Sequence, residues 1–445
     1  VEMADSSQNL RLKTAKPSRK IFILADDFTG ACDTGICFRS PDNQVRISLD
    51  SSRPWSPDAG ENVVQVFLSD TRKYGPDRAY QIAYDAAKKL DDFGGKIRLY
   101  QKIDSTMRGN VGREISAVLR ARGLHTAVLC PAFPGTHRIV RDGKLLIGGK
   151  PISQTAYAHD PRNPIHVDRM ADIVRLTNSE IDIVETKPEN LAKTLRKLEE
   201  KPSEAVVVPD AETEQDLETI ADALTAFPDI LAVGAAGLGK HLARQWLTGW
   251  RKGLAERPAV DRLIVASGSA NPRSLKQLSV LEENVSFPLV RIDKRQLTRR
   301  ENAAEEMLRV QRTLQSAVQR SKAVGIALSQ ERINDTPYGG PFETYVGKMV
   351  SYCMDLIKEK SENVGILIAG ADTAVTICRM LGIKTLMPQR EVVTGIPYSI
   401  SGQGFHLISK AGGFGDDDAL LKGIQFFMPD LVPQKTREKI TAGGY

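Results

Sequence analysis

Short apolar runs that end in polar turns recur along this chain, and they constrain its fold more than any other feature. Residues with helical periodicity follow each run, an alternation that is typical of βαβ units around a mostly parallel sheet. In the first half, the runs are "IFILA" (21–25), "VVQVFLS" (63–69), "IRLYQKI" (97–103), "TAVLCPA" (126–132), "AVVVP" (205–209) and "ILAVG" (230–234). We therefore predict an α/β fold, with one hairpin at Asp142-Gly143.

The same pattern stops and restarts, which indicates two domains. The stretch "TGWRKGLAERPAVD" (248–261) is polar and contains Pro258, as expected of a linker. At 445 residues, the chain is also too long for one ordinary core. We predict two domains, each a mostly parallel sheet flanked by helices. The predicted boundaries are an N-terminal tail (1–18), a first domain (19–250), a linker (251–261), a second domain (262–430) and a C-terminal tail (431–445).

Composition narrows the class of protein. The 61 basic and 55 acidic residues leave a net charge of +6, spread thinly, and only 6% of residues are aromatic, which argues against nucleic-acid binding. No apolar run reaches the roughly 18 residues of a membrane span, and the polar first twenty residues lack a signal-peptide core. The five cysteines are scattered and form no CxxC pair, as in reduced proteins. We expect a cytoplasmic protein that binds neither membrane nor nucleic acid.

Two adjacent carboxylates, Asp26 and Asp27, follow the first apolar run in "LADDFTG". One aspartate there could cap a helix, but two repel each other. The pair therefore needs cations, hydrogen-bond donors or a substrate nearby.

Two further runs also end in charged and hydroxyl side chains. "YQKIDSTMRGNVGRE" (100–114) carries Lys102, Asp104, Ser105 and Arg108, and "FLSDTRKYG" (67–75) carries Arg72. A helix cap explains one hydroxyl but not these charges. Lys and Arg beside helix N-terminal N–H groups suit an oxyanion, so the three run ends together predict a site for a small anionic molecule.

The second domain instead offers small residues after its apolar runs, which lets backbone N–H groups reach phosphate oxygens. This favours nucleotide binding, and two α/β domains in series usually place a site in the cleft between them. The clusters contain Ser267, the turn Gly370, Ala371, Asp372 and Thr373, and the glycines Gly412, Gly413 and Gly415.

The segment "GAAGLGKH" (234–241) fits the phosphate-binding pattern G-x-x-x-x-G-K. A P-loop then needs Ser or Thr to hold Mg²⁺, whereas His241 stands here. We predict a close-packed turn with Lys240 on the helix surface, and keep a P-loop NTPase as the alternative. No hydrolase triad or metal-spaced histidine pair is visible.

These motifs, in this order, resemble the four-carbon acid sugar kinase family: "LADDFTGACDTG", "QKIDSTMRGNVG", "PAFPGTHRIVRDG", "ASGSANPRS", "GADTA" and "GGFG". The resemblance covers roughly residues 19–430. It implies an acid-sugar-binding N-terminal domain, a nucleotide-binding C-terminal domain, and ATP-dependent phosphorylation of the terminal hydroxyl of D-threonate, D-erythronate or 3-oxo-tetronate.

The resemblance also implies residue roles. One aspartate of "DDFTG", Arg72 and the stretch Lys102, Ile103, Asp104 and Ser105 would hold the acid sugar, with Arg108 beside them. ATP would lie against Ser267, the Gly370–Thr373 turn and Gly412–Gly413. Two departures stand out: Ala371 replaces a glycine of the family pattern, and Cys32 stands where Asn is common. "ACDTG" looks closer to the threonate and erythronate kinases than to the oxo-tetronate kinases.

The expected reaction is attack of the substrate C4 hydroxyl on the γ-phosphate of ATP, with Mg²⁺ on the phosphates. Asp27, or its neighbour Asp26, would be the general base, and we favour Asp27 because it follows the residue that ends the strand. Arg72 and Lys102 would neutralise the substrate carboxylate. Asp372 or Asp416 would help hold Mg²⁺, although the sequence identifies no metal ligand set. D-threonate is the favoured substrate, a non-enzymatic sugar-acid sensor is a second alternative, and a homodimer is kept open.

Overall fold

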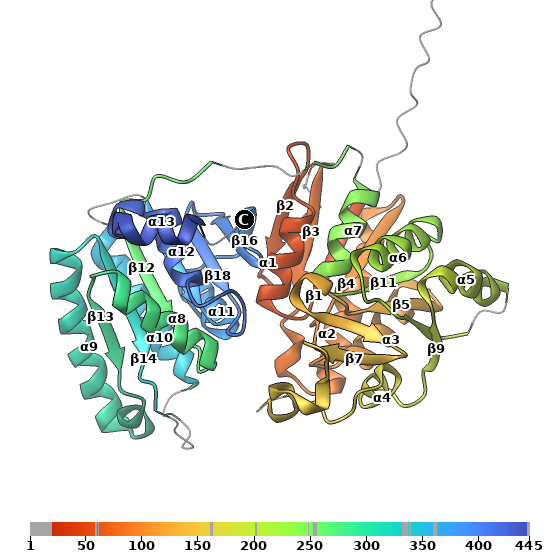
Figure 1. Cartoon of the computed structure of the whole chain (residues 1–445), viewed down its shortest axis with the longest axis horizontal. Coiled ribbons are helices and arrows are strands. Elements are labelled where there is room, and N and C mark those ends of the chain that lie inside the picture. The colour runs from red at the N-terminus through yellow and green to blue at the C-terminus, as the bar shows by residue number, and fades with distance from the viewer. Residues whose placement is uncertain are drawn as a thin grey trace, which may run out of the picture.

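The computed structural model describes residues 20–57, 60, 62–160, 163–200, 203–247, 249–251, 256–331, 337, 340–358 and 363–442. The predicted N-terminal tail and residues 252–255 of the predicted linker lie outside this part of the chain. Figure 1 shows two α/β lobes side by side, with helix α1 (Phe28–Cys37) and strand β16 (Thr385–Val393) between them.

The N-terminal lobe is built on a parallel sheet of eight strands in the order β2-β3-β1-β4-β11-β5-β10-β9. Six of these strands coincide with the predicted apolar runs: β1 (Lys20–Ala25), β3 (Val63–Leu68), β4 (Ile97–Lys102), β5 (Thr126–Cys130), β10 (Ala205–Pro209) and β11 (Leu231–Gly234). Two edge strands, β2 (Gln44–Ser48) and β9 (Asp182–Thr186), were not predicted. The flanking helices are α1, α2 (Pro76–Lys88), α3 (Val111–Arg122), α4 (Met170–Arg175), α5 (Leu191–Glu200), α6 (Glu214–Ala226) and α7 (Ala236–Trp246).

A separate small sheet contains the predicted hairpin. Strands β6 (Arg138–Arg141) and β7 (Lys144–Ile147) are antiparallel, and β8 (Lys150–Pro151) adds to them. Asp142 and Gly143 connect the first two strands with φ values of 48° and 68°. These left-handed conformations are the ones that a tight two-residue hairpin turn requires, so the prediction is confirmed.

The C-terminal lobe has the strand order β13-β14-β12-β15-β18-β17-β16. Its parallel strands are β12 (Arg262–Ser267), β13 (Leu289–Ile292), β14 (Ala323–Leu328), β15 (Val364–Ala369) and β18 (His406–Lys410), whereas β16 and β17 (Ile396–Ser401) are antiparallel to their neighbours. The helices are α8 (Pro272–Asn284), α9 (Arg300–Arg320), α10 (Phe342–Lys358), α11 (Ala371–Met380), α12 (Ala419–Phe427) and α13 (Gln434–Ala442). Helix α13 therefore occupies most of the segment that was predicted to be a C-terminal tail.

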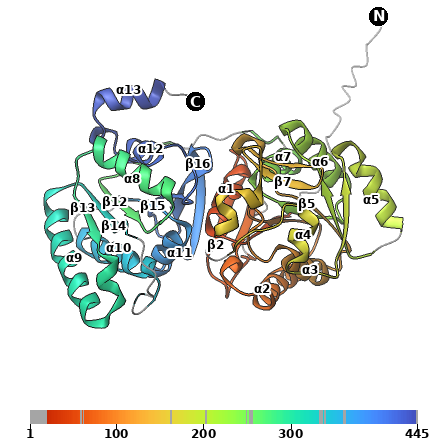
Figure 2. The same cartoon turned by 60° about the horizontal axis from the view of Figure 1, so that its bottom comes forward.

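The two lobes share one sheet. Strand β16 pairs antiparallel with β2 through Thr385–Ser48 and Leu386–Ile47, and the Leu49 N–H donates to the Lys384 carbonyl over 2.9 Å. This joins the two predicted sheets into a single sheet of 15 strands. Figure 2 shows the same junction from a second direction, with β2 and β16 again at the boundary. Helix α1 reinforces it by contacting α11, β16 and β17.

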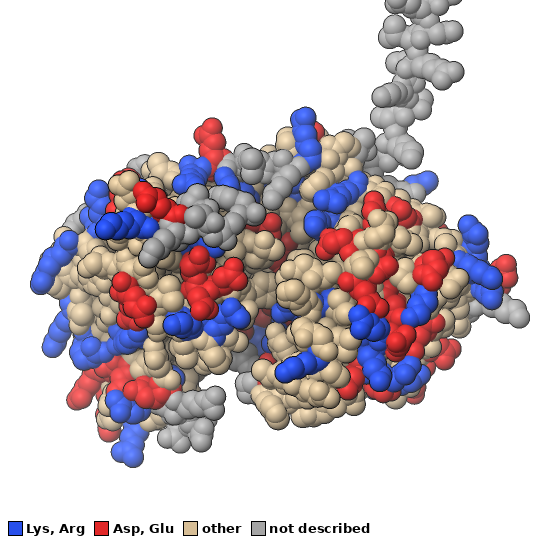
Figure 3. Space-filling view, in the orientation of Figure 1, with Lys and Arg blue, Asp and Glu red and all other residues tan. Residues whose placement is uncertain are grey.

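The inner parallel strands are largely buried on both faces, as the apolar runs predicted, whereas β2, β9 and β13 carry half-buried or exposed residues. The burial is complete along β5, β10, β14 and β15. On the face shown in Figure 3, Lys and Arg alternate with Asp and Glu and gather into no single-sign patch. Within the described residues, every helix is too short or too polar to cross a membrane.

Candidate functional site

The charged run ends of the N-terminal lobe meet at one edge of its sheet. Strand β1 lies between β3 and β4, and all three are parallel, so their carboxyl ends are neighbours. Asp26 follows β1, Arg72 lies in the short 3-10 turn after β3, and Lys102 ends β4. The convergence predicted from the sequence is therefore present in the structure.

Asp26 is paired with Arg72. Its side chain is 3% exposed, and the guanidinium donates from Nε to Oδ2 over 3.2 Å and from Nη2 to Oδ1 over 3.0 Å. Burial raises the pKa of Asp26 to about 6, while the charge of Arg72 opposes that rise. Arg72 Nη2 also lies 3.1 Å from Asp27 Oδ1. One arginine thus bridges the two adjacent carboxylates and offsets their repulsion.

Asp27 has a different environment. It is the N-cap of α1, where Oδ1 accepts the Gly30 N–H over 2.8 Å. Its side chain is 16% exposed, and Oδ2 makes no hydrogen bond or ion pair with the described residues. A methyl group at Gly30 would lie 2.6 Å from both Asp27 Oδ1 and Lys102 Nζ, so glycine is needed for these groups to approach. Asp27 therefore keeps one carboxylate oxygen available for a ligand.

Lys102 is a buried cation, with a side chain only 4% exposed. Its Nζ donates to the Ile103 carbonyl over 2.9 Å and lies 3.8 Å from Asp33 Oδ1. Burial acts to lower the pKa of Lys102, but the carboxylates of Asp33 and Asp27 outweigh it and the pKa is raised. Lys102 therefore stays charged, with part of its donor capacity unused.

Asp104 and Arg108 form a second ion pair at this edge. Arg108 Nε donates to Asp104 Oδ2 over 2.6 Å, and its Nη1 donates to Asp160 Oδ2 over 3.0 Å. Burial acts to raise the pKa of Asp104, but Arg108 and Arg72 hold it well below its usual range. Ser105 is 8% exposed beside this pair. Ile103, also predicted as a substrate residue, is fully buried and contributes backbone contacts.

Two buried acids at the same edge were not among the predicted site residues. Asp33 lies on α1, where burial raises its pKa to about 7 against the charge of Lys102. Glu114 lies on α3, is 3% exposed, and has its pKa raised to about 8, first by burial and then by the charge of Asp26. The sequence contained a signal for Glu114, because this acidic residue lies on the apolar face of its helix with Ile115 and Val118, which indicates a buried acid.

The predicted nucleotide residues also converge, at the carboxyl edge of β12, β15 and β18. Gly370 has φ 117°, and a methyl group there would lie 2.9 Å from Thr373 Oγ1. A methyl group at Gly412 would lie 2.8 Å from Ser269 Oγ. The turn after β12, the turn that opens α11 and the loop after β18 are thus in contact.

The individual predicted members of this nucleotide site have different surroundings. Ser267 ends β12 and is buried, Ala371 and Asp372 open α11, and Thr373 is fully buried beneath the turn. At Gly413, a methyl group would meet no atom closer than 3.8 Å, so backbone there is open to a ligand.

The segment 234–241 is packed as a close turn. A methyl group at Gly237 would lie 2.5 Å from the Ala132 carbonyl, and one at Gly234 would overlap the Cys130 carbonyl. Lys240 Nζ is 3.3 Å from Glu214 Oε2, and His241 contacts the same oxygen at 2.9 Å. Protein atoms therefore fill the space that a P-loop gives to phosphate, and the predicted close packing is confirmed.

A cavity of about 220 Å³ lies between the lobes, next to the end of β3. It is lined by residues of both lobes, including Leu68, Ser69, Tyr74, Arg78, Val375 and Arg379. At its wall, Arg379 Nη2 on α11 donates to Asp70 Oδ2 over 3.0 Å. Asp70 has φ 53° and lies two residues before Arg72, so this ion pair connects the second lobe to the Arg72 turn.

Comparisons with known proteins agree with this geometry. A sugar-binding N-terminal domain family matches residues 21–242, and a nucleotide-binding C-terminal domain family matches residues 263–420. A D-threonate kinase from Salmonella typhimurium is 28% identical over 427 residues, covering 92% of this chain and 98% of the relative. A D-erythronate kinase from Heliobacterium modesticaldum is 27% identical over 445 residues, with coverage of 92% and 98%.

More distant relatives extend the likeness. A 3-oxo-tetronate kinase from Pseudomonas fluorescens is 24% identical over 440 residues, covering 92% of this chain and 97% of the relative. A solved Salmonella typhimurium structure, described as a tRNA synthase, has a TM-score of 0.74 at 22% identity and covers 92% of this chain and 100% of that one. At that identity the structural match supports the fold alone.

Proposed function

Because the chain belongs to the four-carbon acid sugar kinase family, matched in both of its domains, we propose that it transfers the γ-phosphate of ATP to the terminal C4 hydroxyl of a four-carbon sugar acid, with D-threonate as the preferred substrate. One observation carries this proposal. A cation-rich edge with an open carboxylate oxygen in one domain accompanies glycine-lined loops in the other.

The acid end of the substrate suits the cations of the N-terminal lobe. Lys102 has donors to spare, and the Arg108 side chain is 25% exposed. Arg72 is already bonded to Asp26 and Asp27, so it would join a substrate carboxylate as a shared partner. Together with Ser105 and the Asp104 backbone, these groups would fix the carboxylate and its hydroxyls.

Asp27 is the proposed general base. Its Oδ2 is free of described partners, whereas both oxygens of Asp26 accept from Arg72. A general base contributes typically about 10² to 10⁴ in rate by accepting the hydroxyl proton in the transition state. Asp26 would instead act as the residue that orients Arg72.

ATP would bind in the C-terminal lobe, against Ser267, the Gly370–Thr373 turn and Gly412–Gly413. Mg²⁺ usually takes one or two carboxylates together with waters and substrate phosphates. Among the described residues no cluster of three acidic or His/Cys side chains could hold a metal ion alone, which agrees with such a shared site. Asp372 and Asp416 are the residues proposed to hold it, and the bound ion would neutralise charge on the phosphates.

The proposed location is between the lobes. Helix α1 begins at Asp27 and contacts α11, which begins at the Gly370 turn. This contact brings the elements that carry the base and the nucleotide turn together. Catalysis of phosphoryl transfer depends on alignment of the reactants and on charge stabilisation. Both are favoured when water is excluded from the site.

A coupled ADP-release assay across sugar acids of four to six carbons tests the function directly. We expect turnover with D-threonate above that with D-erythronate, 3-oxo-tetronate and longer acids, and a thermal shift with the same ranking. Higher turnover with D-erythronate or 3-oxo-tetronate would support the kinase activity but identify a different preferred substrate. ATP and acid binding without ADP release would establish a non-enzymatic sensor instead. Lys240→Ala tests the P-loop alternative, and full activity of this variant would exclude it.

A further inference from the structure

Lys410 is a buried cation that the proposed mechanism leaves unused. It is the last residue of β18, and its side chain is 1% exposed. Its Nζ donates to Ser274 Oγ over 3.0 Å and to the Gly412 carbonyl over 3.2 Å. Among the described residues, no carboxylate lies within ion-pair distance of this nitrogen. Lysines are rarely fully buried without a carboxylate partner, so this arrangement needs an explanation.

The surroundings of Lys410 add positive potential. Ser274 lies in the first turn of α8, where unpaired N–H groups carry the positive end of the helix dipole. Burial, with a smaller contribution from the charge of the neighbouring Arg273, lowers the pKa of Lys410 to about 7. Negative charge brought to this position would therefore favour the ammonium form over the neutral amine.

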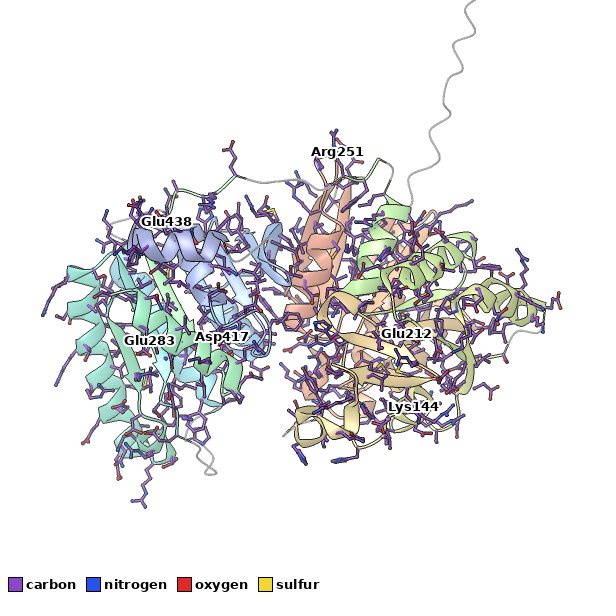
Figure 4. All side chains as sticks on the ribbon, in the orientation of Figure 1. Lys144, Glu212, Arg251, Glu283, Asp417 and Glu438 are labelled. Atoms are coloured by element: carbon purple, nitrogen blue, oxygen red, sulfur yellow. The ribbon has the colours of Figure 1, made fainter. Side chains whose placement is uncertain are left out.

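Several charged groups lie on the elements packed around Lys410, but among the described residues none of their carboxylates forms an ion pair with it. Arg273 on α8 faces Asp417 at 3.8 Å, and Asp416 uses its carbonyl to accept from Gln277. Asp372 opens α11, and His406 begins β18 at the opposite end of the strand, bonded to Tyr398. Figure 4 places Asp417 on the side of the C-terminal lobe nearer to the other lobe.

Lys410 contacts two of the loops proposed for the nucleotide, and it also contacts helix α8, which follows the third. Ser267, Ala369 and Lys410 are in register across β12, β15 and β18. The Gly370 N–H donates to the Lys410 carbonyl over 2.9 Å, while Lys410 Nζ donates to the Gly412 carbonyl. One residue therefore connects the turn that opens α11, the glycine loop after β18 and the start of α8.

We propose that Lys410 is a positioning residue for the nucleotide: it ties the Gly412–Gly413 loop to α8 and takes up a proton when the phosphates of the nucleotide bind in front of that loop. The proposal rests on the nucleotide site of the proposed function. The proton comes from solvent, and the ammonium that forms balances phosphate charge. Lys410 acts through the loop and through its charge, without a role in bond breaking.

Calorimetric titration of ADP at pH 8, in two buffers of different ionisation enthalpy, tests the proton uptake. Wild type should take up a substantial fraction of one proton more than Lys410→Met does. The variant should bind ADP at least tenfold more weakly, yet bind adenosine, which lacks phosphates, with unchanged affinity. Ser274→Ala is the matched control, because it removes an acceptor but keeps the Lys410 amine, and it should retain the proton uptake.

Thermal unfolding separates positioning from a structural role. Loss of a buried group whose pKa is lowered removes a folding cost, so Lys410→Met should keep or raise the Tm at pH 7. A fall in Tm with equal losses of ADP and adenosine affinity would overturn the proposal, as would wild-type proton uptake in Lys410→Met. Failure of wild type to bind ADP at all would overturn the proposed function as well.

Discussion

At the scale of single residues, Asp26 and Asp27 are neighbours in sequence that occupy different environments. Asp26 is buried against Arg72, while Asp27 caps α1 and its Oδ2 makes no hydrogen bond within the described part of the chain. The sequence was sufficient to predict that cations would offset the pair. It could not predict which cation does so, because Arg72, Lys102 and Arg108 all follow neighbouring strands. Only packing assigns Arg72 to the pair and directs Arg108 to Asp104 and Asp160.

Substitution of the two aspartates should therefore have different effects. Asp27→Asn should lower kcat by about 10² to 10⁴ with little change in ADP affinity or Tm, since it removes the proposed base. Asp26→Asn should lower the Tm, because it removes the more buried of the two adjacent carboxylates that Arg72 bridges. Steady-state kinetics and thermal unfolding measure both. Near-normal turnover in Asp27→Asn, with none in Asp26→Asn at unchanged Tm, would make Asp26 the base.

Glu114 leads to a prediction about pH. Its pKa is about 8 when folded, against an ordinary value near 4.5. Between these values the unfolded chain loses a proton that the folded chain keeps, so wild-type stability falls as the pH rises through this window, by at most about 1.4 kcal/mol per pH unit. Glu114→Gln lacks this loss. Its Tm should therefore rise relative to wild type from pH 4.5 to pH 8 and stay level above.

The exposed Glu283, labelled in Figure 4, is the matched control for this measurement. Glu283→Gln should follow the wild-type stability at each pH. A constant difference between Glu114→Gln and wild type over the whole window would show that Glu114 titrates normally.

At the scale of elements, apolar runs located the parallel strands and missed those with a different pattern. The six predicted runs of the first domain became strands of its sheet, because strands buried on both faces read as continuous apolar stretches. Strand β2 alternates between buried and exposed residues, and β16 and β17 contain Pro388 and Pro397. A proline within an apolar run argues against a central strand. The sequence therefore did not reveal the antiparallel segment or its pairing with β2.

The glycines of α7 carry a prediction at this scale. Gly237→Ala should destabilise the fold despite the better helix propensity of alanine, which is worth about 1 kcal/mol. The added methyl group would lie 2.5 Å from the Ala132 carbonyl, so the helix must move away from β5. Gly135→Ala is the control, because a methyl group there would lie no closer than 3.8 Å to any other atom. Urea unfolding should show a lower midpoint for Gly237→Ala alone, and equal midpoints would contradict the packing argument.

At the scale of the whole molecule, α11 links the two predicted binding regions. It begins at the Gly370 turn, and Arg379 near its end binds Asp70, two residues from Arg72. The Arg379 side chain is 59% exposed, so the ion pair contributes little to stability. We expect its role to be a coupling between the proposed nucleotide turn and the proposed acid-binding edge.

Arg379→Ala should therefore weaken the effect of one ligand on the other, while the Tm stays close to wild type. Sugar-acid affinity is measured with and without saturating ADP, and the ratio of the two dissociation constants gives the coupling. We expect a reduction of that ratio by roughly two- to tenfold, since coupling energies are typically 1–3 kcal/mol. Asp70→Asn should have the same effect, and the double variant should add nothing further. Wild-type ratios in both single variants would rule out this route.

The strand pairing at the junction has a consequence for how the chain can be divided. Each lobe contributes one strand, β2 or β16, whose outer backbone groups are satisfied by the other lobe. Expressed alone, either half would present that row of N–H and C=O groups as an open template, and such edges recruit strands from other molecules. Aggregation or strand exchange between copies is thus the natural failure of a truncated form. Each half covers the strand edge of the other, so the two halves are best kept in one chain when the protein is expressed or engineered.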